Sequence, residues 1–254
     1  MIFLHFFSSL FIIRTDMNSI DEEIKSKLLH YGADIVGFGS LEQLPDNVRE
    51  GLPIGIIVAI AYPKEVICGI SQYPTQEYCD WYHKLNDKLD MLVTKGAALL
   101  RDKGYKAVAQ SRDKVGSGEL RNSGESNDNT LLPHKTVATR AGIGWIGKCA
   151  LLVTKKYGSA IRISSILTDA PLQTAEPVNS SLCGDCMLCT KNCPAGAVSG
   201  KLWDVSVYRD EFFDPVKCRK TARERARLGF GGENITICGK CIEICPYTNC
   251  SSLD

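Results

Sequence analysis

The sequence lacks a net charge of either sign, and it lacks an apolar run long enough to cross a bilayer. Its 254 residues carry 30 Lys and Arg against 29 Asp and Glu, for a formal net charge of +1. Such a balance gives no overall field that would draw the protein to nucleic acid or anionic lipid, although a local basic patch is compatible with it. Hydrophobic residues make up 44% and charged residues 23%. These proportions exclude a disordered, collagenous or integral membrane chain.

The longest apolar stretch, MIFLHFFSSLFII at residues 1–13, has no basic residues before it and no small-residue cleavage site after it. A bilayer span takes about 20 residues, and a signal peptide needs both flanks, so neither is predicted. We expect translation to start at Met17, with residues 1–16 a non-native or disordered leader. A weak membrane-surface anchor is the alternative. Without an export signal, the protein is expected to be cytoplasmic.

Hydrophobic periodicity predicts an α+β domain before the cysteine-rich part of the chain. Apolar residues recur at helical spacing over 20–29, opened by a capping box at Ser19, and over 82–100. Further elements are expected as strands at 34–38, 55–61, 106–110, 150–154 and 159–167, a short helix at 136–140 and a polar loop at 111–129. The composition changes near 175–182. This change divides the chain into an α+β domain at 17–177 and a cysteine-rich domain at 178–254.

Nine of the 12 cysteines lie between Cys183 and Cys250. The first motif, at 183–194, has the spacing C-x2-C-x2-C-x3-C-P, in which three thiolates hold one iron–sulfur cluster and the fourth ligates a second cluster. The second motif, at 238–246, has a related spacing, and Cys218 adds a thiolate upstream. Two [4Fe–4S] clusters are therefore predicted. The expected ligand sets are Cys183, Cys186, Cys189 and Cys245 for one cluster, and Cys193, Cys218, Cys238 and Cys241 for the other.

Zinc and disulfides are the competing interpretations of the cysteines. Two sets of four thiolates could bind zinc, but zinc sites usually pair two C-x2-C units without a third cysteine followed by C-P. A reducing cytosol disfavours disulfides. Four cysteines fall outside the pattern and are excluded from ligation. Cys68, Cys79 and Cys149 are expected as small core residues, and Cys250 as a stray thiol.

Between the two motifs lies a run of basic residues: Lys217, Arg219, Lys220, Arg223, Arg225 and Arg227. A nucleic-acid patch is one interpretation of this run. We favour a solvated helix whose positive charge offsets the negative charge of the thiolate-ligated clusters nearby.

Several segments outside the cysteine motifs are specific to one family. They are VGF at 36–38, YHK at 82–84, RAGIGWIGK at 140–148, YGS at 157–159 and ILTDAPL at 166–172. With these segments, residues 19 to about 248 resemble the cobalamin- and iron–sulfur-dependent epoxyqueuosine reductases and, more distantly, the corrinoid-dependent reductive dehalogenases. The resemblance implies a nitroreductase-like α+β domain that binds cobalamin, followed by a bacterial-ferredoxin-like module with two [4Fe–4S] clusters. In the family, electrons pass through the clusters to cobalt, which reduces the substrate.

The resemblance also indicates which residues face the cofactor. Tyr82 and His83 are expected near its upper face. The RAGIGWIGK block supplies four further candidates, namely Gly142, Gly144, Trp145 and Gly147. Glycine lets a backbone approach a flat macrocycle closely, but tight turns explain these glycines equally well.

The proton donor has two candidates. The essential aspartate of the family corresponds to Asp128, although the surrounding sequence departs from the Asp-Thr-Gly-Pro-like stretch of the family. His134 is the alternative proton source, because an unperturbed imidazole titrates closer to neutral pH than a carboxyl group.

The resemblance ends before a further region of the family. Full-length reductases continue into a helical-repeat extension that helps hold tRNA, whereas this chain ends at Asp254, so a short form is expected. We expect an oxidoreductase that receives electrons from a flavodoxin or ferredoxin and reduces a substrate that the sequence does not identify. Two alternatives stay open: an electron-transfer protein that serves a partner enzyme, and a minimal tRNA epoxyqueuosine reductase.

Overall fold

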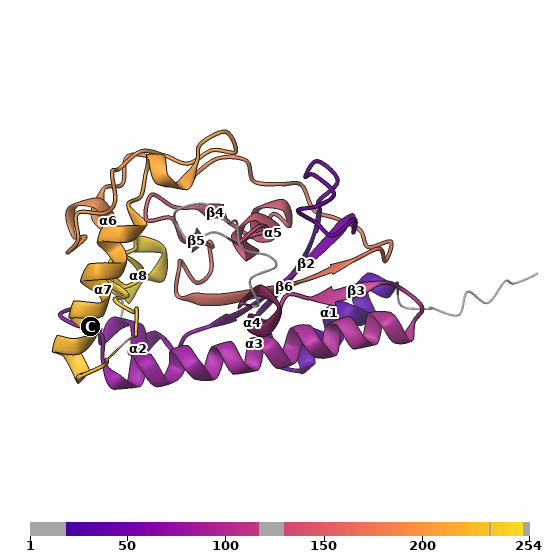
Figure 1. The fold of residues 1–254 in the computed structure, drawn as a ribbon, viewed down its shortest axis with the longest axis horizontal. Helices are drawn as coiled ribbons and strands as arrows, with labels where there is room; N and C mark the ends of the chain where they lie inside the picture. The colour runs from indigo at the N-terminus through magenta and orange to yellow at the C-terminus, as the bar shows by residue number, and fades with distance from the viewer. Residues whose placement is uncertain (1–18, 117–129, 234, 251–254) are drawn as a thin grey trace, which may run out of the picture.

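A four-stranded antiparallel sheet forms the centre of the fold. The computed structural model describes residues 19–116, 130–233 and 235–250. The strand order is β1 (Ile35–Ser40), β2 (Ile54–Ala61), β6 (Ile161–Thr168), β3 (Ala107–Ala109). In the register of the sheet, Ile57 of β2 pairs with Gly37 on one side and with Ser165 on the other. Helices α1 (Ile20–His30) and α3 (Gln76–Asp102) lie on one face, and α5 (His134–Arg140) lies on the other (Figure 1).

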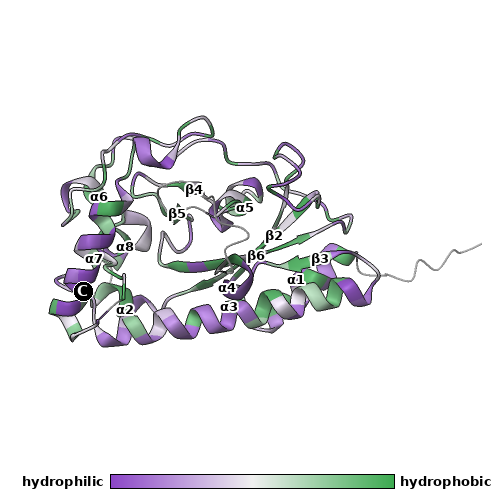
Figure 2. Cartoon of the chain, viewed as in Figure 1, coloured by the Kyte–Doolittle hydropathy of each residue, from purple (hydrophilic) through white to green (hydrophobic). Residues whose placement is uncertain are grey.

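Strand β2 supplies apolar side chains to both faces of the sheet. Ile56 and Val58 pack with the core residues of α1 and α3, whereas Ile57 and Ala59 pack with those of α5. Successive side chains of a strand point to opposite faces, so a continuous apolar sequence is what a strand covered on both sides requires. Figure 2 shows this hydrophobic character along the central strands.

The two long helices begin at capping residues. Ser19 accepts a hydrogen bond from the backbone N–H of Glu22, which is one of the two bonds of the predicted capping box, and Thr75 accepts one from the N–H of Tyr78. The second cap starts α3 six residues before the apolar stripe that the sequence revealed. The helix ends before Gly104, as predicted, where the backbone adopts a φ of +88°.

The remaining elements are short, apart from one helix. They are α2 (Lys64–Cys68), α4 (Arg112–Gly116), β4 (Trp145–Ile146), β5 (Leu152–Val153), α6 (Leu188–Lys191), η1 (Arg209–Glu211), α7 (Pro215–Phe230), α8 (Lys240–Glu243) and η2 (Pro246–Thr248). The predicted loop at 111–129 is wrong at its start, where α4 forms. Arg112 is held there by Asp87 and Asp90 of α3, each at 2.5 Å.

The cysteine-rich segment packs into the same core as the sheet. Ala226 of α7 and Ile237 are buried in the cluster of apolar residues that α3 covers. A Cβ atom on Gly239 would lie 2.2 Å from Cδ1 of Ile70, so the segment touches the chain around α2 closely. The two parts of the chain therefore share one core. The domain boundaries at 17–177 and 178–254 stay a prediction. Figure 1 shows α6, α7 and α8 together at one end of the sheet.

The leader 1–16 and the expected start at Met17 lie outside the described residues. In the part of the chain that the structure describes, no helix is both long enough and apolar enough to cross a membrane.

Candidate cluster sites and the adjoining cavity

The eight proposed ligand cysteines lie at one end of the molecule, and all are half-buried. They come from α6, α7, α8 and the loops beside them. The contact between α6 and α8 brings the two cysteine motifs together. Sharp turns at Gly184 (φ +51°) and Gly239 (φ +74°) direct the chain within the motifs, in a left-handed conformation that favours glycine.

The thiols of Cys245 and Cys218 lie beside the cysteines with which the predicted ligand sets group them. Cys245, from the second motif, neighbours Cys183 and Cys189 of the first. Cys218 neighbours Cys238 and also Cys193, again from different motifs. The structure thus brings together three members of each predicted ligand set.

Burial, together with smaller contributions from the neighbouring thiols Cys238 and Cys193, raises the pKa of the Cys218 thiol to about 11. Crowded thiolates of this kind suit iron ions, whose positive charge compensates them. Among the described residues, no three Cys, His, Asp or Glu side chains converge closely enough to bind a single metal ion. A [4Fe–4S] cluster spaces its thiolates more widely, because each thiolate binds a different iron.

The RAGIGWIGK block supports the first cysteine motif directly. The indole Nε1 of Trp145 donates a hydrogen bond to Sγ of Cys183 across 3.3 Å. Nζ of Lys148 donates to the carbonyl oxygens of Gly184 and Cys186, both at 2.9 Å, and the residue is only 4% exposed. The sequence analysis missed Lys148 as a site residue. Its place as the last residue of the RAGIGWIGK block could have marked it.

The glycines of this block face the chain itself. A Cβ atom on Gly144 would lie 2.2 Å from the carbonyl oxygen of Val153, and one on Gly142 would lie 2.7 Å from that of Glu176. A Cβ on Gly147 would lie 2.8 Å from Cγ2 of Val153. Each of these glycines therefore permits a close approach of other parts of the chain. Their place beside a macrocycle stays a prediction.

A cavity of about 300 Å³ lies where the α5 side of the sheet meets the cysteine-rich segment. Its lining includes the beginning of α5, the residues Ile161–Ile163 of β6, and Ile242 of α8. The hydroxyl of Ser159, also in the lining, is buried and has no hydrogen-bond partner among the described residues. A buried hydroxyl without a partner is costly, so this atom is available to a polar group of a bound molecule.

His134 lines this cavity with an altered acidity. Its Nδ1 lies 2.8 Å from Oγ of Ser165. Burial, with a smaller contribution from the positive charge of Arg162, lowers the pKa of His134 to about 4. The imidazole is therefore neutral at pH 7, which corrects the expectation of a pKa near neutrality. Asp128, the other candidate proton donor, lies outside the described residues.

Arg162 is a cavity residue that the sequence did not reveal. Its guanidinium donates to Oδ1 of Asn86 at 3.0 and 2.8 Å and lies 4.4 Å from the ring centroid of Tyr82. Tyr82 and His83 themselves line a different cavity, of about 570 Å³, between α3 and the segment that follows α7. Arg162 thus links Tyr82 to the first cavity, whereas His83 lies outside the lining of that cavity.

The four cysteines outside the motifs divide into two pairs. Cys79 and Cys149 are buried free thiols, which confirms the prediction for them. The Cys149 thiol contacts those of Cys189 and Cys241, one from each predicted ligand set. Cys68 and Cys250 instead form a disulfide across 182 residues, so their prediction as a core thiol and a stray thiol was wrong. The fold brings the end of α2 against the segment after η2, and no local spacing shows this.

Comparison with known proteins agrees with this geometry. Residues 182–248 match the 4Fe-4S double cluster binding domain. The curated epoxyqueuosine reductase of Listeria monocytogenes is 31% identical over 174 residues, which cover 66% of this chain and 38% of that protein. The chain resembles the epoxyqueuosine reductases. A second relative, the epoxyqueuosine reductase of Leadbetterella byssophila, is 28% identical over 209 residues, 81% of this chain and 62% of that protein. The chain spans less than two thirds of the length of either relative.

Solved structures show the same fold. The epoxyqueuosine reductase of Bacillus subtilis matches 90% of this chain and 65% of its own with a TM-score of 0.56 at 18% identity. A reductive dehalogenase, described with a mechanism for B12-dependent dehalogenation, matches 90% of this chain and 31% of its own with a TM-score of 0.67 at 19% identity. This chain thus has a mixed α/β fold that is joined to a double-cluster domain.

Proposed function

We propose that this protein is an iron–sulfur oxidoreductase that delivers electrons from two [4Fe–4S] clusters to a substrate bound in the cavity at His134 and Arg162. The position of Ile242 carries the proposal. This residue lies between the ligand cysteines Cys241 and Cys245 in the sequence, and its side chain forms part of the cavity wall. A molecule in the cavity is therefore next to the cluster module, as one-electron transfer requires.

The ligand sets that we propose are the crossed ones. Cys183, Cys186, Cys189 and Cys245 hold one cluster, and Cys193, Cys218, Cys238 and Cys241 hold the other. The neighbourhoods of Cys245 and Cys218 support this assignment, because Cys245 lies beside two cysteines of the first motif and Cys218 lies beside one cysteine of each motif. The clusters are then close to each other, and a flavodoxin or ferredoxin is the electron donor that suits such a relay.

Cobalamin is the further cofactor that we propose, within a nitroreductase-like α+β domain. The likeness to a B12-dependent reductive dehalogenase supports it. When bound, cobalamin supplies the metal centre that reduces the substrate. The cavity at His134 and a neighbouring one of about 380 Å³, which shares Pro133 and Lys135 with it, are each smaller than a cobalamin. We therefore assign no residue contacts to cobalamin and derive no step through it.

The residues of the cavity contribute charge and hydrogen bonds. Arg162 is held rigidly by Asn86, so it offers a fixed positive charge to an anionic or electron-rich group. Ser159 offers an unused hydroxyl. For the proton that accompanies reduction, Asp128 and His134 remain the two candidates. Because His134 is neutral at pH 7, it acts there as a hydrogen-bonding group.

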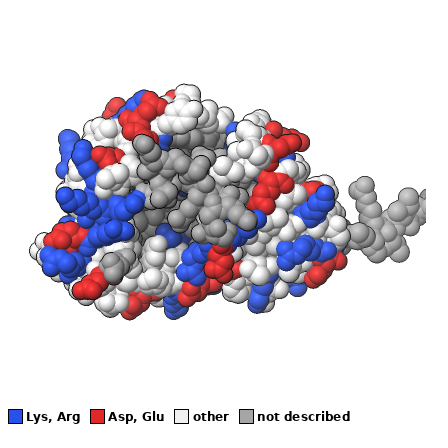
Figure 3. Space-filling model, in the orientation of Figure 1, with Lys and Arg blue, Asp and Glu red and all other residues white. Residues whose placement is uncertain are grey.

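The epoxide of epoxyqueuosine in tRNA is the substrate that the relatives favour, since the curated relatives are epoxyqueuosine reductases. A surface feature supports an RNA substrate. The outward side of α7 exposes Lys217, Lys220, Arg223 and Arg227. Figure 3 shows Lys and Arg side chains gathered over this end of the molecule. Phosphate groups bind such a surface in a salt-dependent manner.

Anaerobic reconstitution tests the proposal in two steps. With iron and sulfide, the protein should bind about eight iron atoms per chain and give the EPR and visible spectra of [4Fe–4S] clusters. Zinc without sulfide would contradict it. Addition of cob(II)alamin should then shift the cobalt EPR signal with stoichiometric retention.

Turnover distinguishes the enzyme from the electron-transfer alternative. Reduced protein is incubated with tRNA that carries epoxyqueuosine, and the nucleosides are measured by liquid chromatography and mass spectrometry. Conversion to queuosine should fall at least tenfold in Arg162→Met, with cluster content unchanged, because the cavity loses its fixed charge. Arg101→Met, which changes an arginine that bonds Ala107 outside the cavity, is the matched control. Intact clusters without conversion would favour an electron-transfer protein.

A further inference from the structure

We infer that Cys68 and Cys250 form a third redox centre, a disulfide that accepts two electrons from the cluster system at Cys245. The inference rests on the proposed function, because the iron–sulfur clusters are the source of the electrons. It concerns two cysteines that lie outside both cluster motifs.

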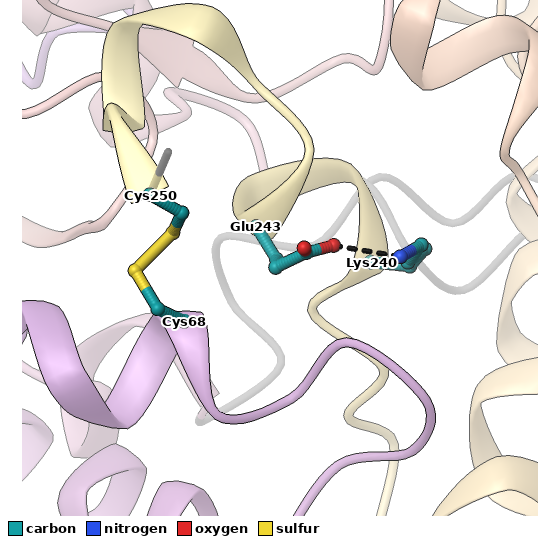
Figure 4. Close-up of a disulfide and its surroundings, with 4 residues drawn as sticks. All are labelled: Cys68, Lys240, Glu243 and Cys250. Carbon is teal, nitrogen blue, oxygen red and sulfur yellow. Dashed lines mark hydrogen bonds and ion pairs between the residues drawn. A yellow bond between two sulfur atoms is a disulfide. The ribbon is translucent and has the colours of Figure 1, made fainter. Parts of the chain in front are cut away.

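The disulfide joins two segments that are far apart in the sequence. Cys68 is the last residue of α2, and Cys250 follows η2. Their Cα atoms lie 5.4 Å apart, within the range of ordinary disulfides. Figure 4 shows the bond beside Glu243 of α8, whose carboxylate is paired with Lys240 at 2.7 Å.

The disulfide shares a cavity with a proposed cluster ligand. A cavity of about 720 Å³ is lined by both bonded cysteines, by Cys245 and by its neighbour Ile244. Cys250 also lies only five residues after Cys245, mostly across the 3₁₀ turn η2. At the rise of a 3₁₀ helix, five residues advance the chain by about 10 Å. The sulfur atoms of the disulfide are therefore close to the cluster that Cys245 binds.

Other contacts hold the two segments that the disulfide joins, so the bond is not needed to keep them in place. Helix α2 is already anchored by Val66 and Ile67, which are 3% and 0% exposed. Thr248 of η2 is buried as well, and a Cβ atom on Gly158 would lie 2.4 Å from its backbone nitrogen. The two segments are thus held by apolar and backbone contacts independently of the disulfide.

The bond is also accessible. Cys68 and Cys250 are half-buried, and exposed residues such as Glu65, Gly69 and Asn249 surround them in the cavity. Exposed disulfides are the ones that exchange or accept electrons, whereas buried ones resist reduction. Solvent in the cavity can supply protons.

The reduction of this disulfide balances with two clusters. Each cluster gives one electron and returns to its oxidised level. The two electrons break the S–S bond between Cys68 and Cys250, and two protons from solvent convert the sulfurs into thiols. The disulfide thus allows a chain of one-electron carriers to store an electron pair.

A reductive titration of the holoprotein tests this inference. Photoreduced deazaflavin, a one-electron donor, is added anaerobically to protein with both clusters. Wild type should take up about four electrons per chain, two for the clusters and two for the disulfide, whereas Cys68→Ser/Cys250→Ser should take up about two. Cys79→Ser, which removes a buried free thiol, is the matched control and should still take up about four.

Alkylation with iodoacetamide during the titration gives a second readout. Mass spectrometry should show that the linked peptide of Cys68 and Cys250 disappears while the electrons are taken up. A linked peptide that persists after both clusters are reduced would overturn the inference, and so would a wild type that accepts only two electrons. If the double variant loses its clusters, Cys250→Ser alone replaces it. Failure of the proposed function is distinguishable, because it would appear earlier as missing iron and sulfide.

Discussion

Trp145 and Cys183 are 38 residues apart, and Nε1 of the indole donates a hydrogen bond to Sγ of the cysteine across 3.3 Å. The same indole forms a T-shaped pair with the ring of Tyr247, next to the second cysteine motif, with centroids 4.9 Å apart. One side chain of the RAGIGWIGK block therefore contacts segments of both motifs.

Replacement of Trp145 by Phe should lower the reduction potential of the cluster that Cys183 binds. Hydrogen bonds to a ligand sulfur stabilise the more negative, reduced cluster. A bond of about 1 kcal/mol corresponds to about 40 mV for one electron. An EPR-monitored redox titration measures the shift. Trp81→Phe, which alters an indole of α3 that packs against Lys84, should leave the potential unchanged. An equal shift in both variants would contradict this role of the indole.

Replacement of Lys148 by Met should loosen the first cysteine motif. The buried ammonium bonds two carbonyl oxygens of the turn between Cys183 and Cys186, and these acceptors would lose their partner. We expect a loss of about 1–3 kcal/mol in the free energy of unfolding and iron content closer to four atoms than to eight. Urea denaturation and iron analysis measure the two effects. Lys191→Met, at an exposed position, should change neither, and a Lys148→Met protein with full iron content would contradict the prediction.

Mild acid should destabilise the protein through His134. The pKa of His134 is lowered to about 4 in the folded state, against 6.5 for the ordinary side chain, so the unfolded chain binds the proton more readily. Stability is then complete above about pH 6.5 and falls as the pH decreases toward 4. Between pH 7.5 and pH 5.5 the loss should be about 1 kcal/mol.

The same denaturation series with His134→Gln isolates this contribution. Glutamine retains a hydrogen-bonding side chain but does not titrate, so the variant should lose about 1 kcal/mol less than wild type over this pH range. Parallel pH profiles of the two proteins would show that His134 is not held in its neutral form.

Replacement of Gly144 by Ala should cost more stability than replacement of a glycine with open space around it. The new Cβ would lie 2.2 Å from the carbonyl oxygen of Val153, so the backbone must shift. We expect a loss of about 2–3 kcal/mol. Gly196→Ala, at a φ of +57° with no atom within 4 Å of the new Cβ, should cost about 1 kcal/mol. Thermal unfolding of both variants provides the comparison, and equal losses would contradict the packing role of Gly144.

Local patterns in the sequence were sufficient for much of the fold. The strands β1, β2 and β6 and the helices α1 and α3 lie close to their predicted positions, because apolar spacing and capping residues act within a few residues of the chain. The start of α4 was missed because its stabilising partners, Asp87 and Asp90, lie on another helix.

The candidate site was predicted less evenly. Cysteine spacing identified the cluster domain, since ligands of one cluster recur within a short motif. Arg162 was missed because nothing in the sequence of β6 marks it, and its partners, Asn86 and Tyr82, lie on α3. His134 stays a candidate, and its acidity follows from burial that only the folded chain creates.

The sequence by itself determined the cluster domain and the main elements, because each depends on residue types at short and fixed spacing. The tertiary structure decided three further features: the cavity that Ile242 closes, the hydrogen bond from Trp145 to Cys183, and the disulfide between Cys68 and Cys250. Each of these joins segments far apart in the chain. Such pairs meet only when the sheet and its helices have packed, since the burial of their apolar faces sets which distant segments become neighbours.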